Sequence, residues 1–410
     1  MSCVTIFSSD FCHADSVVKE VLDKTGFTLV TENEIIAEAS KLSGMSEEKI
    51  EHAFSPKTSV FNKFTLEKEN ALAHLKLAVA EMLAENNLLI VGYGGLLVPR
   101  EITHILHVCL VGDIQNRIAV AKEKQGLSEK NAKKMIKELD KERAYCVKTL
   151  HGTEDPWDPS LYDLVIPIGE SNIKDAAALI DDYLKKDIVK PTVASRQVVD
   201  DFLLSSKVAV ALGREGHDVD VSASKSQVTL TINKHVLMLS RLEDELKKIV
   251  TNVAGVESIT TKVGGSFHKS DVYRKCDFDI PSKVLLVDDE REFVQTLSER
   301  LMLRDMGSAV AHDGEAALKL IAEDDPEVLV LDLKMPGLDG IEVLRRVKES
   351  RPDVEVIILT GHGSETDRET CMKLGAFAYI HKPVDIDVLT AKLNEANKKV
   401  QEKKSSQKKE

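Results

Sequence analysis

The stretch EVLVLDLKMPGLDGIEVL, residues 327–344, decides the fold of the C-terminal part of the chain. Its aliphatic run VLVL, at 328–331, predicts a strand that is buried on both faces. Asp332 follows this run at once, and a loop with proline and glycine comes next. A carboxylate at the tip of a buried strand is costly without partners. Its partners are therefore expected at the ends of neighbouring strands.

Four more runs of this kind lie between residues 284 and 395, and each is followed by a helical pattern. They are VLLV at 284–287, SAVA at 308–311, VEVIIL at 354–359 and FAYI at 377–380. Strands that alternate with helices predict a five-stranded, doubly wound parallel sheet. In such a sheet the reactive groups lie beyond the carboxyl ends of the strands.

The residues at those ends combine acids with one lysine. Asp288 and Asp289 follow the first strand, Asp332 the third, Thr360 the fourth and Lys382 the fifth. Three carboxylates brought together repel one another unless a cation or protons compensate them, and oxygen ligands of this kind suit Mg²⁺. The lysine supplies a second positive charge, as a phosphoryl group would require. Asp339, before Gly340, is expected to cap the following helix instead.

Four segments in this order, LLVDDE, LVLDLKMPGLDG, IILTGHG and AYIHKP, resemble the receiver domain of two-component response regulators, over residues 282–397. The resemblance implies that Asp332 is the phosphoacceptor. It also implies that Asp288 and Asp289 hold Mg²⁺ with Asp332, and that the main-chain carbonyl of Lys334 completes the protein's share of the metal shell.

The same resemblance implies a switch. Lys382 would neutralise charge on the transferred phosphoryl group, and a cis bond is expected before Pro383. Thr360 would donate its hydroxyl to the new phosphoryl group and draw its loop inward, while Tyr379 would fill the space left behind. A sensor histidine kinase is the partner that this chemistry implies.

Residues 1–190 alternate short aliphatic runs with longer helical patterns, which predicts an α/β domain with a parallel sheet. The segments LIVGYGG, RIAVAKEKQGLSEKNAKKMIKELDKERAYCVKTLHG and DPSLYDLVIPIG resemble the cytidylate kinase-like family of nucleoside monophosphate kinases. By that resemblance, Arg117 and Arg143 would contact nucleotide phosphates, with Asp140 beside Arg143.

The expected phosphate loop departs from this family. Residues 8–16 read SSDFCHADS, with no glycine, no lysine and two acids that would repel a triphosphate. We therefore expect a fold that no longer catalyses and serves as a binding or dimerisation platform. The alternative is a nucleoside monophosphate kinase regulated by the receiver, or a nucleotide sensor, in which Arg117 and Arg143 hold the phosphates.

Residues 200–265 predict a small α+β module. Val219, Val221, Val228, Leu230 and Ile232 alternate with polar residues, and a helical stripe precedes the segment AGVESITTKV. This module resembles a BON domain, a type associated with phospholipid or ligand binding and with oligomer contacts. A role in protein interaction is favoured here. Residues 266–281 are expected to be a linker, and the lysine-rich tail at 398–410 a frayed, solvated helix end.

At 410 residues the chain is long enough for two to four domains, each with its own core. The formal charge of −13 argues against nonspecific nucleic-acid binding. No secretory signal or membrane-spanning run is visible, and the six scattered cysteines suit a reducing compartment, so a cytoplasmic location is expected. No DNA-binding unit follows the receiver-like part, so a transcription factor is not expected. Receivers commonly form homodimers, but the sequence indicates neither an interface nor the downstream target.

Overall fold

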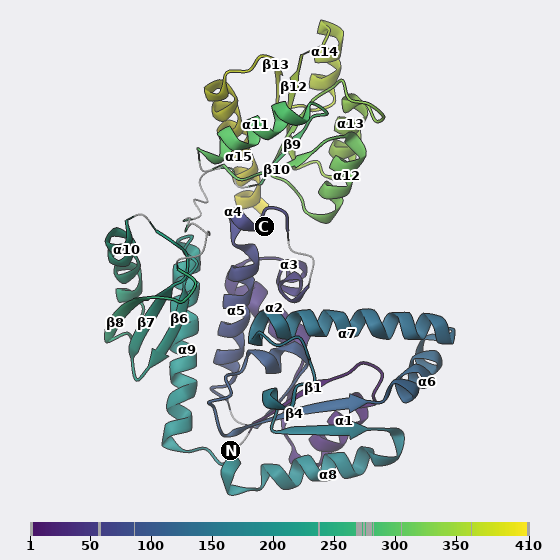
Figure 1. Cartoon of the computed structure of the whole chain (residues 1–410), viewed down its shortest axis with the longest axis vertical. Helices are drawn as coiled ribbons and strands as arrows, with labels where there is room; N and C mark the ends of the chain where they lie inside the picture. Colours follow the sequence, from purple (N-terminus) through teal and green to yellow (C-terminus); the bar gives the residue numbers. More distant parts are fainter. Residues whose placement is uncertain are drawn as a thin grey trace. The chain divides into compact units, whose positions relative to one another are not determined.

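The computed structural model describes residues 3–55, 59–85, 87–236, 238–267, 273, 275, 281, 283–304, 306–361 and 363–407. The chain forms two compact bodies (Figure 1). The first consists of Met1–Thr58 and Glu67–Arg274, and the second of Ser59–Leu66 and Lys275–Glu410. The second body is thus discontinuous in sequence, a feature that nothing in the local sequence pattern predicts.

The first body is built on a parallel five-stranded sheet in the order β2-β3-β1-β4-β5. Its strands are β1 (Cys3–Ser8), β2 (Thr28–Val30), β3 (Leu88–Val91), β4 (Ile105–Gly112) and β5 (Leu164–Ile168). The central strands β1 and β4 are buried almost throughout, as their aliphatic runs require. Helices cover both faces and enclose two apolar clusters.

The helices α1 (Ala14–Thr25) and α8 (Ile173–Leu184) pack on one face of this sheet (Figure 1). The other face is covered chiefly by α2 (Glu32–Ser43), α5 (Glu67–Met82) and α7 (Glu129–His151). The body also contains α3 (Glu47–Glu51), α6 (Ile114–Gln125) and the short 3₁₀ segments η1 (His52–Phe54), η2 (Gly92–Leu97), η3 (Pro159–Leu161), η4 (Glu170–Asn172) and η5 (Asp187–Val189).

A smaller sheet completes the first body. Its strands β6 (Asp220–Ser224), β7 (Gln227–Ile232) and β8 (Ser258–Val263) lie in that order, with β6 antiparallel and β8 parallel to β7. Lys225 and Ser226 both have positive φ in the two-residue turn between β6 and β7, so this hairpin forms without glycine. The helices α9 (Val193–Arg214) and α10 (Leu239–Thr251) bury one face of the sheet.

The second body contains a parallel sheet in the order β10-β9-β11-β12-β13. The strands are β9 (Val284–Val287), β10 (Ser308–Ala311), β11 (Val328–Leu331), β12 (Glu355–Thr360) and β13 (Ala378–His381). Helices α11 (Arg291–Met302) and α15 (Ile386–Gln407) cover one face. The other face carries α12 (Gly314–Glu323), α13 (Gly340–Ser350) and α14 (Glu365–Lys373), and the short helix α4 (Asn62–Thr65) also belongs to this body.

The predicted fold class, two parallel α/β sheets with a small α+β sheet between them in sequence, is confirmed. The tail differs from the expected frayed end, because α15 continues to Gln407 and both Lys399 and Lys403 pair with the buried carboxylate of Glu355. Most of the expected linker at 266–281 lies outside the described residues. None of the described helices has both the length and the apolar character needed to cross a membrane.

Candidate functional site

The register of the second sheet brings the predicted acids together. Strands β9 and β11 are neighbours, with Val287 opposite Leu331, so the next residue of each strand, Asp288 and Asp332, reaches the same edge. The Asp332 amide donates to the Val287 carbonyl at 2.9 Å, which holds the two strand ends together. Carboxylate oxygens of Asp288, Asp289 and Asp332 all lie within 4.8 Å of one another.

Lys382 faces this cluster from the end of β13. Its Nζ lies 2.6 Å from Oδ2 of Asp288 and 3.0 Å from Oε1 of Glu290, and 4.4 Å from the centroid of the Phe293 ring. Its main-chain amide donates to the Thr360 carbonyl at 2.9 Å, and the peptide bond after it is cis, as expected. Glu290 was not among the predicted site residues, although its place directly after Asp289 could have pointed to it.

Burial shapes the electrostatics of this cluster. Desolvation raises the pKa of Asp288, while the hydrogen bonds from Lys382 and the Glu290 amide act against it. Burial by itself would lower the pKa of Lys382, but its hydrogen bonds to Asp288 and Glu290 raise it overall. Asp332 is 5% exposed, and its Oδ1 has no hydrogen-bond partner among the described residues.

This donor set is the kind that Mg²⁺ takes in proteins. Three carboxylates from two strand ends offer oxygen ligands, and Mg²⁺ in proteins commonly completes its shell with waters. Lys334 lies in the loop two residues beyond Asp332, and the part assigned to its carbonyl stays a prediction. Asp339 caps α13 as expected, since its side chain accepts from the Ile341 amide at 3.1 Å.

The two predicted switch residues lie on neighbouring strands. Thr360 is the last residue of β12 and is fully buried, so the strand runs one residue further than expected. Tyr379 lies in β13 opposite Ile358, and its ring is partly buried against the apolar cluster beneath α12 and α13. A Cβ atom built on Gly363 would lie 1.8 Å from the Tyr379 hydroxyl oxygen, so the ring fills space that this glycine leaves free.

In the first body, Arg117 and Arg143 also come together, at the carboxyl end of β1. Arg117 makes a two-pronged contact with Asp140, at 2.9 and 2.6 Å, and its Nε donates to the Asp10 carbonyl. Arg143 donates to the Ser8 carbonyl at 2.8 Å and to the carboxylate of Asp10 at 3.1 Å. Asp140, which was expected beside Arg143, forms an ion pair with Arg117.

The loop after β1 is closed around these pairs. Phe11 and His13 hold positive φ values where a phosphate-binding loop would carry glycine, and Ser9 Oγ accepts from the Gly112 amide at 3.0 Å. Burial raises the pKa of Asp10, although Arg143 and Arg117 both oppose this shift. The two arginines thus donate to the protein's own carboxylates and main-chain carbonyls.

The GYGG segment at 92–95 has a packing role. It forms the 3₁₀ segment η2 directly after β3. A Cβ on Gly94 would meet Ile35 at 2.2 Å, and one on Gly95 would meet Thr5 at 2.8 Å. Glycines are therefore needed here for close packing against α2 and β1.

Comparisons with known proteins find matches for two parts of the chain. Residues 284–394 match the model of the response regulator receiver domain, and residues 3–170 match that of the cytidylate kinase-like family. Response regulator MprA of Mycobacterium avium (strain 104) is 37% identical over 111 residues, 27% of this chain and 49% of that protein. MprA of Mycobacterium ulcerans (strain Agy99) is also 37% identical over 111 residues, 27% of this chain and 48% of that protein.

A solved structure, that of the Francisella response regulator 1452 receiver domain, is 34% identical, with 29% of this chain and 97% of that one covered and a TM-score of 0.28. The chain spans about half the length of the curated relatives that it matches. The two matched families leave residues 200–265 uncovered, so the BON-like character of that module stays a prediction. The chain therefore contains a cytidylate kinase-like domain and, C-terminal to it, a receiver domain of the response regulator family.

Proposed function

We propose that this protein is a response regulator of a two-component phosphorelay, in which Asp332 accepts a phosphoryl group from a sensor histidine kinase. One observation carries this proposal: the Oδ1 atom of Asp332 is buried in a cluster of acids opposite a lysine and has no hydrogen-bond partner among the described residues. An oxygen held in this way is available as a nucleophile.

In the proposed reaction, this oxygen forms a bond to phosphorus while the bond between phosphorus and the donor's imidazole nitrogen breaks. Lys382 leaves Asp288 to neutralise the oxygens of the transferred group. Asp288, Asp289, Asp332 and the carbonyl of Lys334 would hold Mg²⁺, which supplies charge neutralisation for the phosphoryl oxygens when bound. The product is an acyl phosphate on Asp332.

The readout is proposed to run through the face formed by β12 and β13. The hydroxyl of Thr360 would turn to donate to the new phosphoryl group, and the loop after it would follow. The ring of Tyr379 lies directly against this loop at Gly363, so a movement of the loop alters its packing. A local change of charge is thereby converted into a change of surface.

Binding of beryllofluoride with Mg²⁺ tests this site, because beryllofluoride mimics a phosphoryl group on a carboxylate. Calorimetric titration of the full chain is expected to show binding that Asp332→Asn abolishes. Asp339→Asn is the matched control, since Asp339 lies in the same loop but caps α13, and asparagine caps equally well. Undiminished binding by Asp332→Asn would rule the proposed site out.

For the kinase-like domain, we propose a platform without turnover. Asp10 and Asp140 occupy the guanidinium groups of Arg143 and Arg117, which a nucleotide phosphate would need. The alternative, a nucleoside monophosphate kinase or nucleotide sensor regulated by the receiver, requires these pairs to open. Titration of Mg-ATP and then CMP, with and without beryllofluoride, separates the two: binding or turnover that beryllofluoride changes would favour the alternative.

A further inference from the structure

The segment Ser59–Leu66 belongs to the receiver body although its sequence lies inside the kinase-like match at 3–170. Its Phe61 is 1% exposed and joins the apolar cluster beneath α12 and α13. That cluster also contains Leu285 of β9 and Ile321 of α12. A full aromatic side chain of the segment is thus part of the receiver's core.

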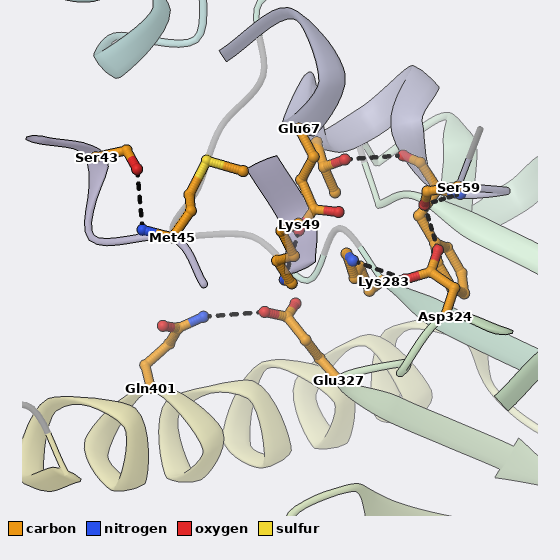
Figure 2. Close-up of polar contacts among 11 residues, drawn as sticks. Ser43, Met45, Lys49, Ser59, Glu67, Lys283, Asp324, Glu327 and Gln401 are labelled. Atoms are coloured by element: carbon orange, nitrogen blue, oxygen red, sulfur yellow. Dashed lines mark hydrogen bonds and ion pairs between the residues drawn. The ribbon is translucent and has the colours of Figure 1, made fainter. Parts of the chain in front are cut away.

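Polar contacts fix the segment at the same place. Ser59 Oγ donates to Asp324, which also accepts from Lys283 at 2.9 Å, and Figure 2 shows these three side chains directed at one another. Lys283 Nζ lies 5.8 Å from the centroid of the Phe61 ring. Ser59 Oγ accepts in turn from the Phe61 amide at 3.0 Å. Both apolar and polar side chains of the receiver body therefore hold the segment in place.

The segment is held at the amino ends of the strands, away from the acidic cluster. Lys283 directly precedes β9 and Asp324 directly follows α12, whereas Asp332 follows the carboxyl end of β11. The apolar cluster connects the two ends, because it contains Phe61 together with Leu331 and Leu333, the neighbours of Asp332. Tyr379 packs against the same cluster.

We propose that residues 59–66 are the output element of the receiver: they pack more tightly against the receiver body when Asp332 is phosphorylated. This inference rests on the proposed function. Protein interiors are close-packed, so repacking of Tyr379 beside Thr360 changes the space available to Phe61 within one cluster. The segment is continuous in the chain with kinase-like residues on either side, and it thereby carries the state of Asp332 into that domain.

Hydrogen exchange of the full chain, with Mg²⁺ and with or without beryllofluoride, tests the inference. In the wild type, beryllofluoride is expected to slow exchange in peptides from 355–361, which report the site, in peptides from 59–66, and in the first residues of α5, which follow the segment directly. Phe61→Ala is expected to keep the response at 355–361 and to lose it in the first residues of α5. Val60→Ala is the matched control, because Val60 is 44% exposed on the same segment.

The output element and the proposed function are contradicted by different results. A response at 355–361 with none at 59–66 would overturn the output element and leave the proposed function standing. No response in either place would overturn the proposed function, and the inference with it. The wild-type comparison decides between these outcomes by itself, even if Phe61→Ala does not fold. A response in α5 that survives unchanged in a folded Phe61→Ala would also overturn the inference.

Discussion

The hydroxyl oxygen of Tyr379 lies 1.8 Å from the point that a Cβ atom on Gly363 would occupy. No side chain larger than hydrogen can share that space, so the position of the ring depends on the glycine. Gly361, two residues earlier in the same loop, has only the Lys382 side chain near its Cβ position, at 3.8 Å. The loop thus contains one glycine that is required by packing and one that is not.

Gly363→Ala is therefore expected to displace the Tyr379 ring from its partly buried place. In protein labelled with fluorotyrosine, the Tyr379 resonance, assigned with Tyr379→Phe, should move toward the position of an exposed ring and stop responding to beryllofluoride. Gly361→Ala should leave the resonance where it is in the wild type. An unmoved Tyr379 resonance in Gly363→Ala would show that the ring does not depend on this glycine.

Asp288→Asn should weaken Mg²⁺ binding by roughly tenfold or more, because it removes one of three negative charges around the proposed metal position. Calorimetric titration with Mg²⁺ measures this directly. Glu299→Gln, an acid of α11 outside the cluster, is the control and should bind as the wild type does. Equal affinities of Asp288→Asn and the wild type would place the metal elsewhere.

Asp324→Ala is expected to destabilise the receiver body by about 3 kcal/mol, because it removes a buried carboxylate that accepts from both Lys283 and Ser59. The side chains of this pair are only 6% and 14% exposed. The adjacent pair of Arg351 and Asp325 is 43% and 60% exposed, so Asp325→Ala should cost about 1 kcal/mol or less. Urea-dependent hydrogen exchange of β9 and β11 peptides reports this body alone. Similar losses in the two variants would contradict the argument from burial.

Acid should destabilise the first body through His107. Burial lowers the pKa of His107 to about 4, from an ordinary value of 6.5. Between these values the unfolded chain binds the extra proton and the folded one does not, so stability falls as the pH falls from 6.5 toward 4. The loss from this group is about 2 kcal/mol at pH 5.

Urea unfolding followed through Trp157, the only tryptophan and a neighbour of Phe7 in the first body, measures this loss. His107→Gln should unfold with a shallower dependence on pH over the same range. Some dependence should remain, because burial also lowers the pKa values of His74, His104 and His151. If the free energy of unfolding of His107→Gln depended on pH as steeply as that of the wild type, His107 would not be the source of the loss.

The receiver site could be predicted from sequence because its geometry follows from local signals. A run such as VLVL at 328–331 fixes a buried strand, and parallel strands end at one edge of a sheet, so Asp288 and Asp332 had to meet. The repulsive acids in the loop at 8–16 were also visible. That Asp10 would bond to Arg143, and Asp140 to Arg117, required the fold itself.

The contact of Phe61 with the receiver core could not be predicted from the sequence. The helix α4, which follows Phe61, has only four residues. Leu285 and Lys283, which lie near Phe61 in the fold, are more than two hundred residues away in the chain, so no periodic pattern predicts the contact. The same holds for Gly363, whose role depends on a ring from the next strand. Long-range packing decides both positions, and local propensity does not encode it.

Phosphoryl transfer to the full chain tests the central claim most directly. The protein is incubated with acetyl phosphate and Mg²⁺, and the acyl phosphate, which alkali and hydroxylamine remove, is located by peptide mass spectrometry. The account predicts that the group is found on Asp332, that chelation of Mg²⁺ prevents its uptake, and that Asp332→Asn takes up none while Asp339→Asn takes it up as the wild type does. Undiminished uptake by Asp332→Asn would contradict the account.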